Sequence, residues 1–511
     1  MSIAFIPNDP RSTTDLPPIT ITPTPNRPAA RAGFNFQGAV AQKVYQPDTR
    51  EFLFWQCREA VLRAIGTFES LAGNVSQWAR SPNRSKLSVD PIFNGDPSMV
   101  GSRRLNAYYD GDGLRFFDFK VHAKPFFSGM STDTVAHETG HALLDSIRPD
   151  LWGSVFPEAA AFHEATGDIM AMIVALRDAA TRARLLTVTS DLSKPNFVEA
   201  NSEYLSEGIR LQFGNVAPSQ PRRALNQFKW QLPTTLPAGT FNDPPGKLTA
   251  EFHSFSRVFS GCFWDVLRNV FAVLGGGEPN LSRAVEVTAK TFLAAARAAV
   301  HTQRFFQEVG RQMVLVDQQN NNGQFREAIK AGFQRHNVAL GTAAMLQPAA
   351  ALAGDGVDIS TGRLPKLAIA DLKRRTGATR LSVVPHAVVG AEAPVARAQY
   401  KREVPLDTIH PKLKGVVAVS DESVLIGASG TRAAVLGAMP MADSADDEVQ
   451  TFVRSLVDAD QIQFEPLPTR RAAMGLVAAR EAKTSDAPPV THAVINDRGK
   501  KVLMRLRFFC Q

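Results

Sequence analysis

Cysteine is scarce in this sequence, with three residues in a chain of 511. Cys57, Cys262 and Cys510 form no CxxC pair, which argues against a disulfide scaffold and against a zinc site built from thiolates. No stretch approaches about 20 uninterrupted apolar residues, so the sequence predicts no membrane-spanning helix. The composition, 44% hydrophobic and 21% charged, is typical of a globular protein with a large core.

Several functional signatures are also missing. The sequence contains neither the GxSxG turn of serine hydrolases nor the GxxxxGK[ST] loop of P-loop ATPases. The net charge of +8 is spread along the chain without a dense basic block, so we expect neither a nucleic-acid partner nor a membrane partner. The first residues lack a basic segment followed by an apolar run. We therefore expect a cytoplasmic protein, unless export uses a route that leaves no such signal.

Apolar spacing and turn residues predict a mixed α+β protein. A proline-rich segment over residues 1–30 is expected to be extended, with a short edge strand at 19–22. Residues 84–128 carry Asn-Gly and Asp-Gly turns between apolar runs and predict strands. Residues 205–250 are expected to form a loop. Helices are expected at 48–74, 132–147, 158–177, 253–273, 280–301, 303–315 and 324–336.

Beyond residue 340 the pattern changes. An Ala- and Gly-rich stretch at 343–364 predicts a linker. Short strand-like runs follow, and a hairpin around the Asn-Asp-Arg-Gly turn is expected over 491–510. The short runs are at 381–384, 415–419, 424–426 and 461–464. This part of the chain carries no chemical motif.

The strongest chemical signal is His-Glu-Thr-Gly-His at residues 137–141. On a helix, positions i and i+4 lie on one face, so His137 and His141 can offer imidazole nitrogens to one metal ion. Glu138 follows the first of these histidines and can reach a water on that ion as a general base. Two histidines hydrogen-bonded inside a buried helix would give the same pattern, so the hypothesis needs a third ligand.

The next predicted helix offers that ligand. A third histidine at HExxHxxGxxH spacing is absent, because residues 142–147 read ALLDSI. Glu164 and Asp168 are again spaced i and i+4, among mostly apolar neighbours. Glu164 is the predicted third ligand, and Asp168 is predicted to accept the second N–H of a ligand histidine. His163 points about 100° away from Glu164 on a helix and is expected to border the site without binding metal.

The motif HETGH followed by Glu-Ala-Thr-Gly-Asp resembles the thermolysin-like zinc peptidases, the gluzincins whose third ligand is glutamate. Residues 105–111, LNAYYDG, are similar to the edge strand of that family. The segments beginning at His253 and at Phe325 resemble its later helices, so the resemblance covers about residues 30–340. It implies a two-lobed zincin with one catalytic zinc ion and a peptide or protein substrate.

The resemblance also assigns roles to other residues. It implies that Asn106 and the backbone of Ala107 hold the substrate, and that His253 stabilises the oxyanion of the transition state. Asp243 and Glu251 are the candidate carboxylate partners of that histidine. The family tyrosine is missing, and Val155 or Phe156 stands near its place. Asp133 matches a position that often binds calcium, but residues 171–186 add only Asp178, so we expect no complete calcium site.

Composition and the resemblance together predict a domain organisation of five parts: an N-terminal extension (1–30), a strand-rich lobe with the edge strand and HExxH helix (31–150), a helical lobe (151–342), the linker (343–364) and a smaller α+β domain (365–511). The predicted function is that of a zinc endopeptidase with Glu138 as general base. Two alternatives stay open: a catalytically weak or inactive zincin-fold module that serves for binding or as a scaffold, and a zinc amidase acting on a non-protein substrate. The last domain is expected to target the enzyme, to cover the cleft as an inhibitor, or to bind a protein partner.

Overall fold

The computed structural model describes the following residues: 1–12, 15–96, 99–216, 220–239, 244–340, 373–374, 378, 380–386, 395–429, 432–436, 442–481 and 490–509. Helices and strands both contribute to the fold, so the predicted α+β class is confirmed. The predicted linker at 343–364 lies outside the described residues.

The first 130 residues contain several short strands and one long helix, α1 (Arg50–Ala72). β1 (Ile3–Phe5) pairs with β2 (Ile19–Ile21), which is the short strand predicted at 19–22. α1 begins where the Thr49 side chain accepts a hydrogen bond from the backbone N–H of Phe52. A separate hairpin joins β7 (Asp118–Val121) and β8 (Lys124–Phe127).

A five-stranded sheet combines four strands from residues 33–116 with one strand from the C-terminal end of the chain. Its order is β18-β5-β6-β4-β3, with β3 (Gly33–Phe36), β4 (Lys86–Asp90) and β6 (Gly113–Phe116) parallel to one another. β5 (Ala107–Tyr109) is antiparallel to β6, and the far C-terminal strand β18 (Phe508–Phe509) is antiparallel to β5. The predicted strand region therefore forms a sheet whose outermost strand comes from the other end of the chain.

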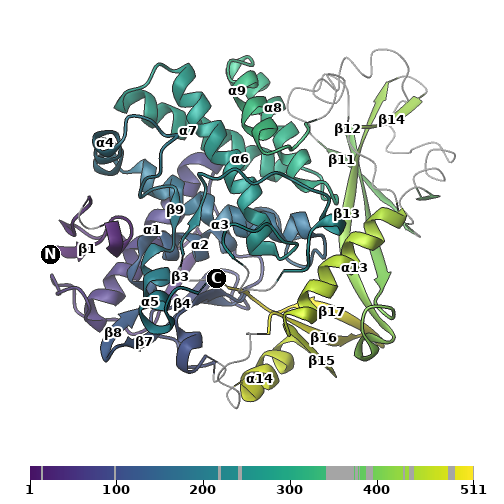
Figure 1. Cartoon of the computed structure of the whole chain (residues 1–511), viewed down its shortest axis with the longest axis horizontal. Helices are drawn as coiled ribbons and strands as arrows, with labels where there is room; N and C mark the ends of the chain where they lie inside the picture. Colours follow the sequence, from purple (N-terminus) through teal and green to yellow (C-terminus); the bar gives the residue numbers. More distant parts are fainter. Residues whose placement is uncertain are drawn as a thin grey trace.

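Two helices form the centre of the molecule (Figure 1). α2 (Thr132–Ile147) spans the predicted range and is capped by the Ser131 side chain. α3 (Pro157–Arg177) starts with a proline at its first position, where no backbone donor is lost. By length and composition α3 would pass as a membrane span, but its apolar window is 100% buried within the protein. Its composition is that of a core helix.

α2 and α3 approach closely because two glycines face each other. A Cβ added at Gly140 would lie 3.1 Å from the Cα of Gly167 and 3.1 Å from the Cβ of Met170. At that distance the neighbouring atoms have to shift by a few tenths of an ångström, so a side chain at position 140 would strain the contact between the helices. This close approach sets the distance between the two halves of the HETGH and EATGD pattern.

The remaining helices of residues 179–340 pack around α3 and largely follow the predicted ranges. The prediction of a loop over 205–250 is wrong at its start, because residues 205–209 belong to a helix that buries one amphipathic face. The helices are α4 (Ala179–Val188), α5 (Glu203–Phe213), α6 (Phe252–Val273), α7 (Glu278–Ala298), α8 (Phe305–Asn321) and α9 (Arg326–Arg335). Two short strands, β9 (Ala200–Asn201) and β10 (Arg222–Arg223), pair antiparallel. Short 3-10 turns are at Pro10–Ser12, Gly101–Arg104, Ser128–Met130, Pro233–Thr235 and Pro411–Leu413.

The C-terminal region builds a second, seven-stranded sheet in the order β11-β12-β13-β17-β16-β15, with β14 also paired to β13. The runs predicted at 415–419 and 424–426 belong to one continuous strand, because the residues between them, 420–423, also pair with β12. The strands are β11 (Ser382–His386), β12 (Val395–Pro405), β13 (Val416–Ser429), β14 (Arg432–Leu436), β15 (Ile462–Leu467), β16 (His492–Asp497) and β17 (Lys500–Arg505). Two helices accompany the sheet, α13 (Ala442–Asp458) and α14 (Arg470–Glu481).

The hairpin expected over 491–510 is shorter than predicted. β16 and β17 pair as expected around the turn at 497–500. The pairing stops at Arg505, and the chain then leaves this sheet to add β18 to the other one. At this exit the Leu506 side chain is buried against Ala473 and Val477 of α14.

The C-terminal region is packed against the rest of the molecule. One buried apolar cluster includes Phe162 of α3, Phe452 of α13 and Phe508 of β18. A buried ion network crosses the same boundary, since Arg304 contacts Glu158 at 3.5 Å and also pairs with Glu448 of α13. Burial raises the pKa of Glu158 to about 7, which Arg304 opposes. These contacts fix the position of α13 relative to α3.

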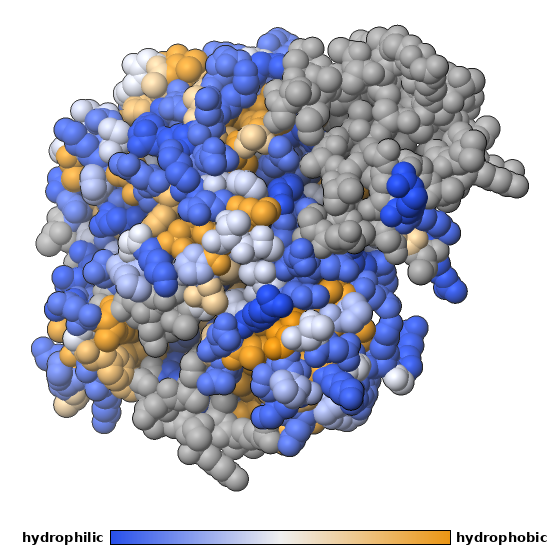
Figure 2. All heavy atoms as spheres, turned by 45° about the vertical axis from the view of Figure 1, so that its right-hand side comes forward, coloured by the Kyte–Doolittle hydropathy of each residue, from blue (hydrophilic) through white to orange (hydrophobic). Residues whose placement is uncertain are grey.

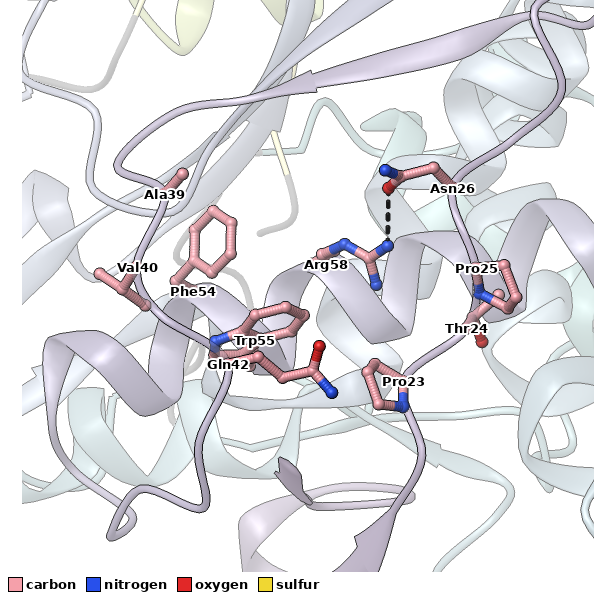
Figure 3. A pocket seen from close by; sticks show the side chains of 10 residues that line it. All are labelled: Pro23, Thr24, Pro25, Asn26, Ala39, Val40, Gln42, Phe54, Trp55 and Arg58. Atoms are coloured by element: carbon pink, nitrogen blue, oxygen red, sulfur yellow. Dashed lines mark hydrogen bonds between the residues drawn. The ribbon is translucent and has the colours of Figure 1, made fainter. Parts of the chain in front are cut away.

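The surface and its pockets add little that is chemically specific. Figure 2 shows hydrophobic side chains in several small patches, each bordered by hydrophilic ones. A pocket of about 390 Å³ lies between the N-terminal extension and α1 (Figure 3). In it Arg58 donates a 2.8 Å hydrogen bond to the Asn26 side chain. No predicted site residue lines this pocket.

The close α2–α3 contact predicts opposite effects of two glycine substitutions. Gly140→Ala should lower the free energy of unfolding by about 1–3 kcal/mol, because the added methyl forces the helices apart. Gly66→Ala, in α1 with open space around its Cβ, should raise it by up to about 1 kcal/mol through helix propensity. Urea unfolding of both variants measures the difference, and equal stability of Gly140→Ala and the parent chain would contradict the packing argument.

Candidate functional site

The site is a buried meeting point of α2 and α3. His137, His141 and Glu164 bring ligand atoms within 4.8 Å of one another. The His137 Nε2 atom lies 3.5 Å from Glu164 Oε2, and the His141 Nε2 atom lies 3.8 Å from Glu164 Oε1. The two imidazole rings stand at 90° to each other with centroids 4.7 Å apart. His137 and His141, one turn apart on α2, thus meet Glu164 of α3 in the predicted cluster.

These three residues have buried polar atoms that lack hydrogen-bond partners. Among the described residues, the Nε2 atoms of His137 and His141 and both carboxylate oxygens of Glu164 are buried and accept or donate no hydrogen bond. Burying unpaired polar atoms costs free energy, and several that converge on one point need a shared partner. Two imidazoles and one carboxylate are the donor set of a catalytic zinc site with an open position. The cluster therefore fits a metal ion.

The outer side of His137 is held by two residues of opposite charge. Its Nδ1 atom lies 3.0 Å from Asp168 Oδ1, and Arg222 donates a 2.8 Å hydrogen bond to the same oxygen. Burial raises the pKa of Asp168, but Arg222 and His137 outweigh it and hold that pKa far below its usual value. Gly167 leaves room for the imidazole, since a Cβ there would lie 2.6 Å from His137 Cε1. The histidine is thereby oriented with Nε2 toward the cluster.

His141 is oriented by His163. Their Nδ1 atoms lie 2.7 Å apart, so one ring donates and the other accepts. Burial and the charge of His137 lower the pKa of His141 well below its usual value, and burial does the same to the pKa of His163. Both rings are therefore neutral, and when His141 uses Nε2 toward the cluster its Nδ1–H donates to His163. Sequence reasoning placed His163 beside the site but missed this contact.

Glu138 stands next to the cluster with its carboxylate free. Both of its oxygens are buried and have no hydrogen-bond partner among the described residues. Burial raises its pKa to about 8 even though the charge of His137 opposes this. A carboxyl with a pKa near neutrality both accepts and releases a proton, which is the property a general acid–base group needs.

His253 reaches the cluster from the first turn of α6. Its Nε2 atom lies 3.4 Å from Glu164 Oε2 and 2.9 Å from the backbone oxygen of Phe509. Its Nδ1 atom lies 2.7 Å from Glu251 Oε1. Burial lowers its pKa, but Glu164 and Glu251 outweigh burial and raise it. Because both hydrogen-bond partners are acceptors, each ring nitrogen carries a hydrogen and His253 is positively charged.

The carboxylate partner of His253 is thus Glu251, which also caps α6 by accepting from the Ser254 N–H. Asp243, the other candidate, lies outside the described residues. A carboxylate at a helix start is a recognisable signal, and it would have selected Glu251 from the sequence. Arg222 had no such signal, because it lies in the two-residue strand β10.

The edge strand β5 lies beside the site. Asn106 is buried, and its side-chain oxygen accepts a 2.8 Å hydrogen bond from the backbone N–H of Ala107. Tyr109 connects β5 to α2 through a 3.1 Å hydrogen bond from its hydroxyl to Asp145. Arg80 pairs with the same carboxylate at 2.8 Å. The edge strand is therefore fixed to the helix that carries both histidines.

Two further sequence expectations concern residues near the site. Val155 and Phe156 are buried, and the Phe156 ring lies 6.0 Å from His301. Asp133 lies in an acidic group with Asp9 and Glu203 that raises the pKa of Glu203 to about 8, chiefly through burial and the charge of Asp133. Its own carboxylate is occupied by backbone N–H donors of residues 134 and 202.

The contact between His137 and Asp168 predicts a loss of metal affinity. Asp168→Ala should weaken metal binding by about 10–100-fold, because the imidazole loses the partner that orients it. Competition with a chromophoric chelator measures the affinity. Asp191→Ala, on an exposed turn, is the control and should bind metal like the parent chain. Equal affinity of the Asp168 and Asp191 variants would show that Asp168 does not position His137.

Comparisons with known proteins do not assign the chain to a family. A scan against family models finds no match, and a search of curated proteins finds no significant match. The functional conclusion therefore rests on the site residues and on the resemblance carried by their motifs.

Proposed function

We propose that this protein is a zinc-dependent endopeptidase with the two-lobed zincin architecture of thermolysin-like enzymes. The observation that carries the proposal is the buried convergence of His137, His141 and Glu164, with the free carboxylate of Glu138 beside them. The strand-rich part with β5 would form one lobe, the helices after α3 the other, and α2 the floor between them.

His137, His141 and Glu164 would hold the zinc ion. When bound, zinc would acidify a water molecule and polarise the carbonyl of the scissile peptide bond. Asp168 and His163 would keep the two imidazoles in the tautomer that leaves Nε2 free, since each contacts the Nδ1 atom of one ligand. The burial of all three ligands excludes bulk water from this side of the site.

Two side chains would handle protons and charge. Glu138 would accept a proton from the attacking water at a carboxylate oxygen and donate it to the departing amine. The Nε2–H of His253 would donate to the oxygen that becomes negative as the carbonyl is attacked. Removing one such donor typically costs about 10²–10³ in turnover. The positive charge of His253, held by Glu251, supports this role.

The substrate would bind as an extended peptide. β5 is held rigidly beside α2, and an edge strand offers backbone hydrogen bonds to any added strand without regard to side chains. This arrangement favours a peptide over a small non-protein amide. A panel containing both classes of substrate tests that preference directly.

A catalytically inactive binding module is the second candidate. It is favoured by one observation, namely that β18 already occupies the position of an added strand on β5. A binding module has no need of the unpaired Glu138 carboxylate, whose burial costs stability.

The role of Glu138 predicts a separation of binding from turnover. Glu138→Gln should retain one zinc ion per chain and lose at least about 10²–10⁴-fold in peptide hydrolysis, because the amide cannot accept the proton. Hydrolysis of a quenched peptide library by zinc-loaded protein measures the loss. Retained turnover in a zinc-replete variant would defeat the assignment.

The role of Glu164 predicts the opposite separation. Glu164→Ala should lower bound zinc well below one ion per chain after dialysis, because only two protein ligands remain. Metal analysis by atomic emission measures the content, with Glu138→Gln as a control of similar charge change. Full zinc occupancy in Glu164→Ala would assign the third ligand to another residue.

A further inference from the structure

The last strand of the chain occupies the position where the proposed function places a substrate. β18 pairs antiparallel with β5, with Phe508 opposite Tyr109 and Phe509 opposite Tyr108. The other edge of β5 is paired with β6, so β18 takes the edge of β5 that faces away from the sheet. In Figure 1 the chain runs from β17 in the C-terminal sheet to the middle of the molecule. A segment of the C-terminal region thus adds itself to the edge strand.

Phe508 packs directly on the metal-site histidines. Its ring stacks on His163 with centroids 4.1 Å apart and on His141 at 5.0 Å, each at 19°. Trp152 meets the same ring edge-on at 5.2 Å. The side chain is completely buried. Phe508 therefore fills the space next to the ligand His141.

Phe509, the next residue, contacts the His253 side of the site. Its backbone oxygen accepts the 2.9 Å hydrogen bond from Nε2 of His253, the atom assigned above to the developing oxyanion. Its ring lies 5.4 Å from Tyr108 in a small buried cluster with Met99 and Phe117. The backbone oxygen of Phe509 and the rings of Phe508 and Phe509 thus occupy the positions that the proposed function gives to a substrate peptide.

Charged side chains hold this segment in place. Arg507 is buried and contacts Asp96 at 2.6 Å. Arg470 of α14 donates hydrogen bonds to the backbone oxygens of Leu506 and Asp110, and so ties the exit of the segment to the end of β5. These bonds join the C-terminal region to the loop after the edge strand.

We propose that residues 506–509 are an internal peptide ligand that closes the cleft, so that an external peptide binds only when this segment leaves β5. The proposal rests on the proposed function for what the cleft does once it is open. Of the three roles that the sequence left open for the C-terminal region, it selects covering of the cleft.

The physical basis is competition for one row of backbone groups. β5 is three residues long and can pair with a single strand on its free edge. A ligand tethered to its own site acts at an effective concentration in the millimolar range, whereas a free peptide of equal affinity must reach that concentration to compete. The closed form therefore excludes micromolar peptide.

The test uses the full chain with the substitutions Phe508→Gly and Phe509→Gly together. A fluorescent peptide with the sequence of residues 504–509, Met-Arg-Leu-Arg-Phe-Phe, is titrated against this variant in a Glu138→Gln background, which prevents cleavage. Met504→Ala, in the same background, is the control, because Met504 is exposed on β17. Fluorescence anisotropy reports binding.

The expected result is saturable binding to the double variant and at least about 100-fold weaker binding to the parent and to Met504→Ala, as expected for release from a tethered competitor. Equal binding to all three proteins would overturn the proposal. Absence of binding to a folded double variant would overturn it as well. If the double variant does not fold, deletion of residues 508–511 replaces it, since that deletion leaves the β16–β17 hairpin intact.

Hydrolysis separates this proposal from the proposed function. With Glu138 restored and zinc bound, the double variant should cleave the quenched library at least about 10-fold faster than the parent. The intact mass of the parent is measured as well, to confirm that the parent has kept its C-terminal residues. Binding without hydrolysis would support the internal ligand and reject the peptidase. Equal hydrolysis by parent and double variant would support the peptidase and overturn the internal ligand.

Discussion

The tight packing of α2 against α3 is the constraint on which the rest of the structure depends. Because Gly140 and Gly167 lack side chains, the helices come close enough for two imidazoles and one carboxylate to meet. The cost is a group of buried polar atoms with no hydrogen-bond partner among the described residues. A cation bound there would offset this cost, which makes the cluster a candidate metal site.

The parts of the site that follow from local spacing could be predicted from the sequence. His137 and His141, and likewise Glu164 and Asp168, are i and i+4 pairs, and helical geometry alone places each pair on one face. The helices themselves were predictable, since their apolar periodicity is strong and Ser131 and Pro157 mark their starts. The sequence could not determine that Asp168 binds the first histidine and His163 the second, because that depends on how the helices cross.

Contacts between distant segments were beyond the sequence. Arg222 lies in a two-residue strand within a stretch poor in periodic signal, and it reaches Asp168 from 54 residues away. β18 is also two residues long, so its Phe-Phe pair looks like the end of the predicted hairpin. Only the three-dimensional structure shows that the chain leaves the C-terminal sheet at Leu506 and joins β5. Local patterns specify elements, whereas the partner of a short strand is decided by tertiary packing.

The C-terminal region packs against the candidate site. Arg304 and Glu448 fix α13 against the helical core, while Arg470 and Arg507 direct the last residues onto the edge strand. The same groups that would recognise a substrate, namely the β5 backbone and His253, are thereby engaged by the chain itself. The candidate site and the last strand of the chain therefore belong to one packed unit.

We propose above that His137, His141 and Glu164 together bind one zinc ion. X-ray absorption spectroscopy of the zinc-loaded protein tests it most directly, because it reads the ligands without relying on activity. The account predicts a first shell of nitrogen and oxygen at about 2.0–2.2 Å with the scattering of two imidazoles. A shell without imidazole scattering, or a protein that retains no zinc, would contradict it.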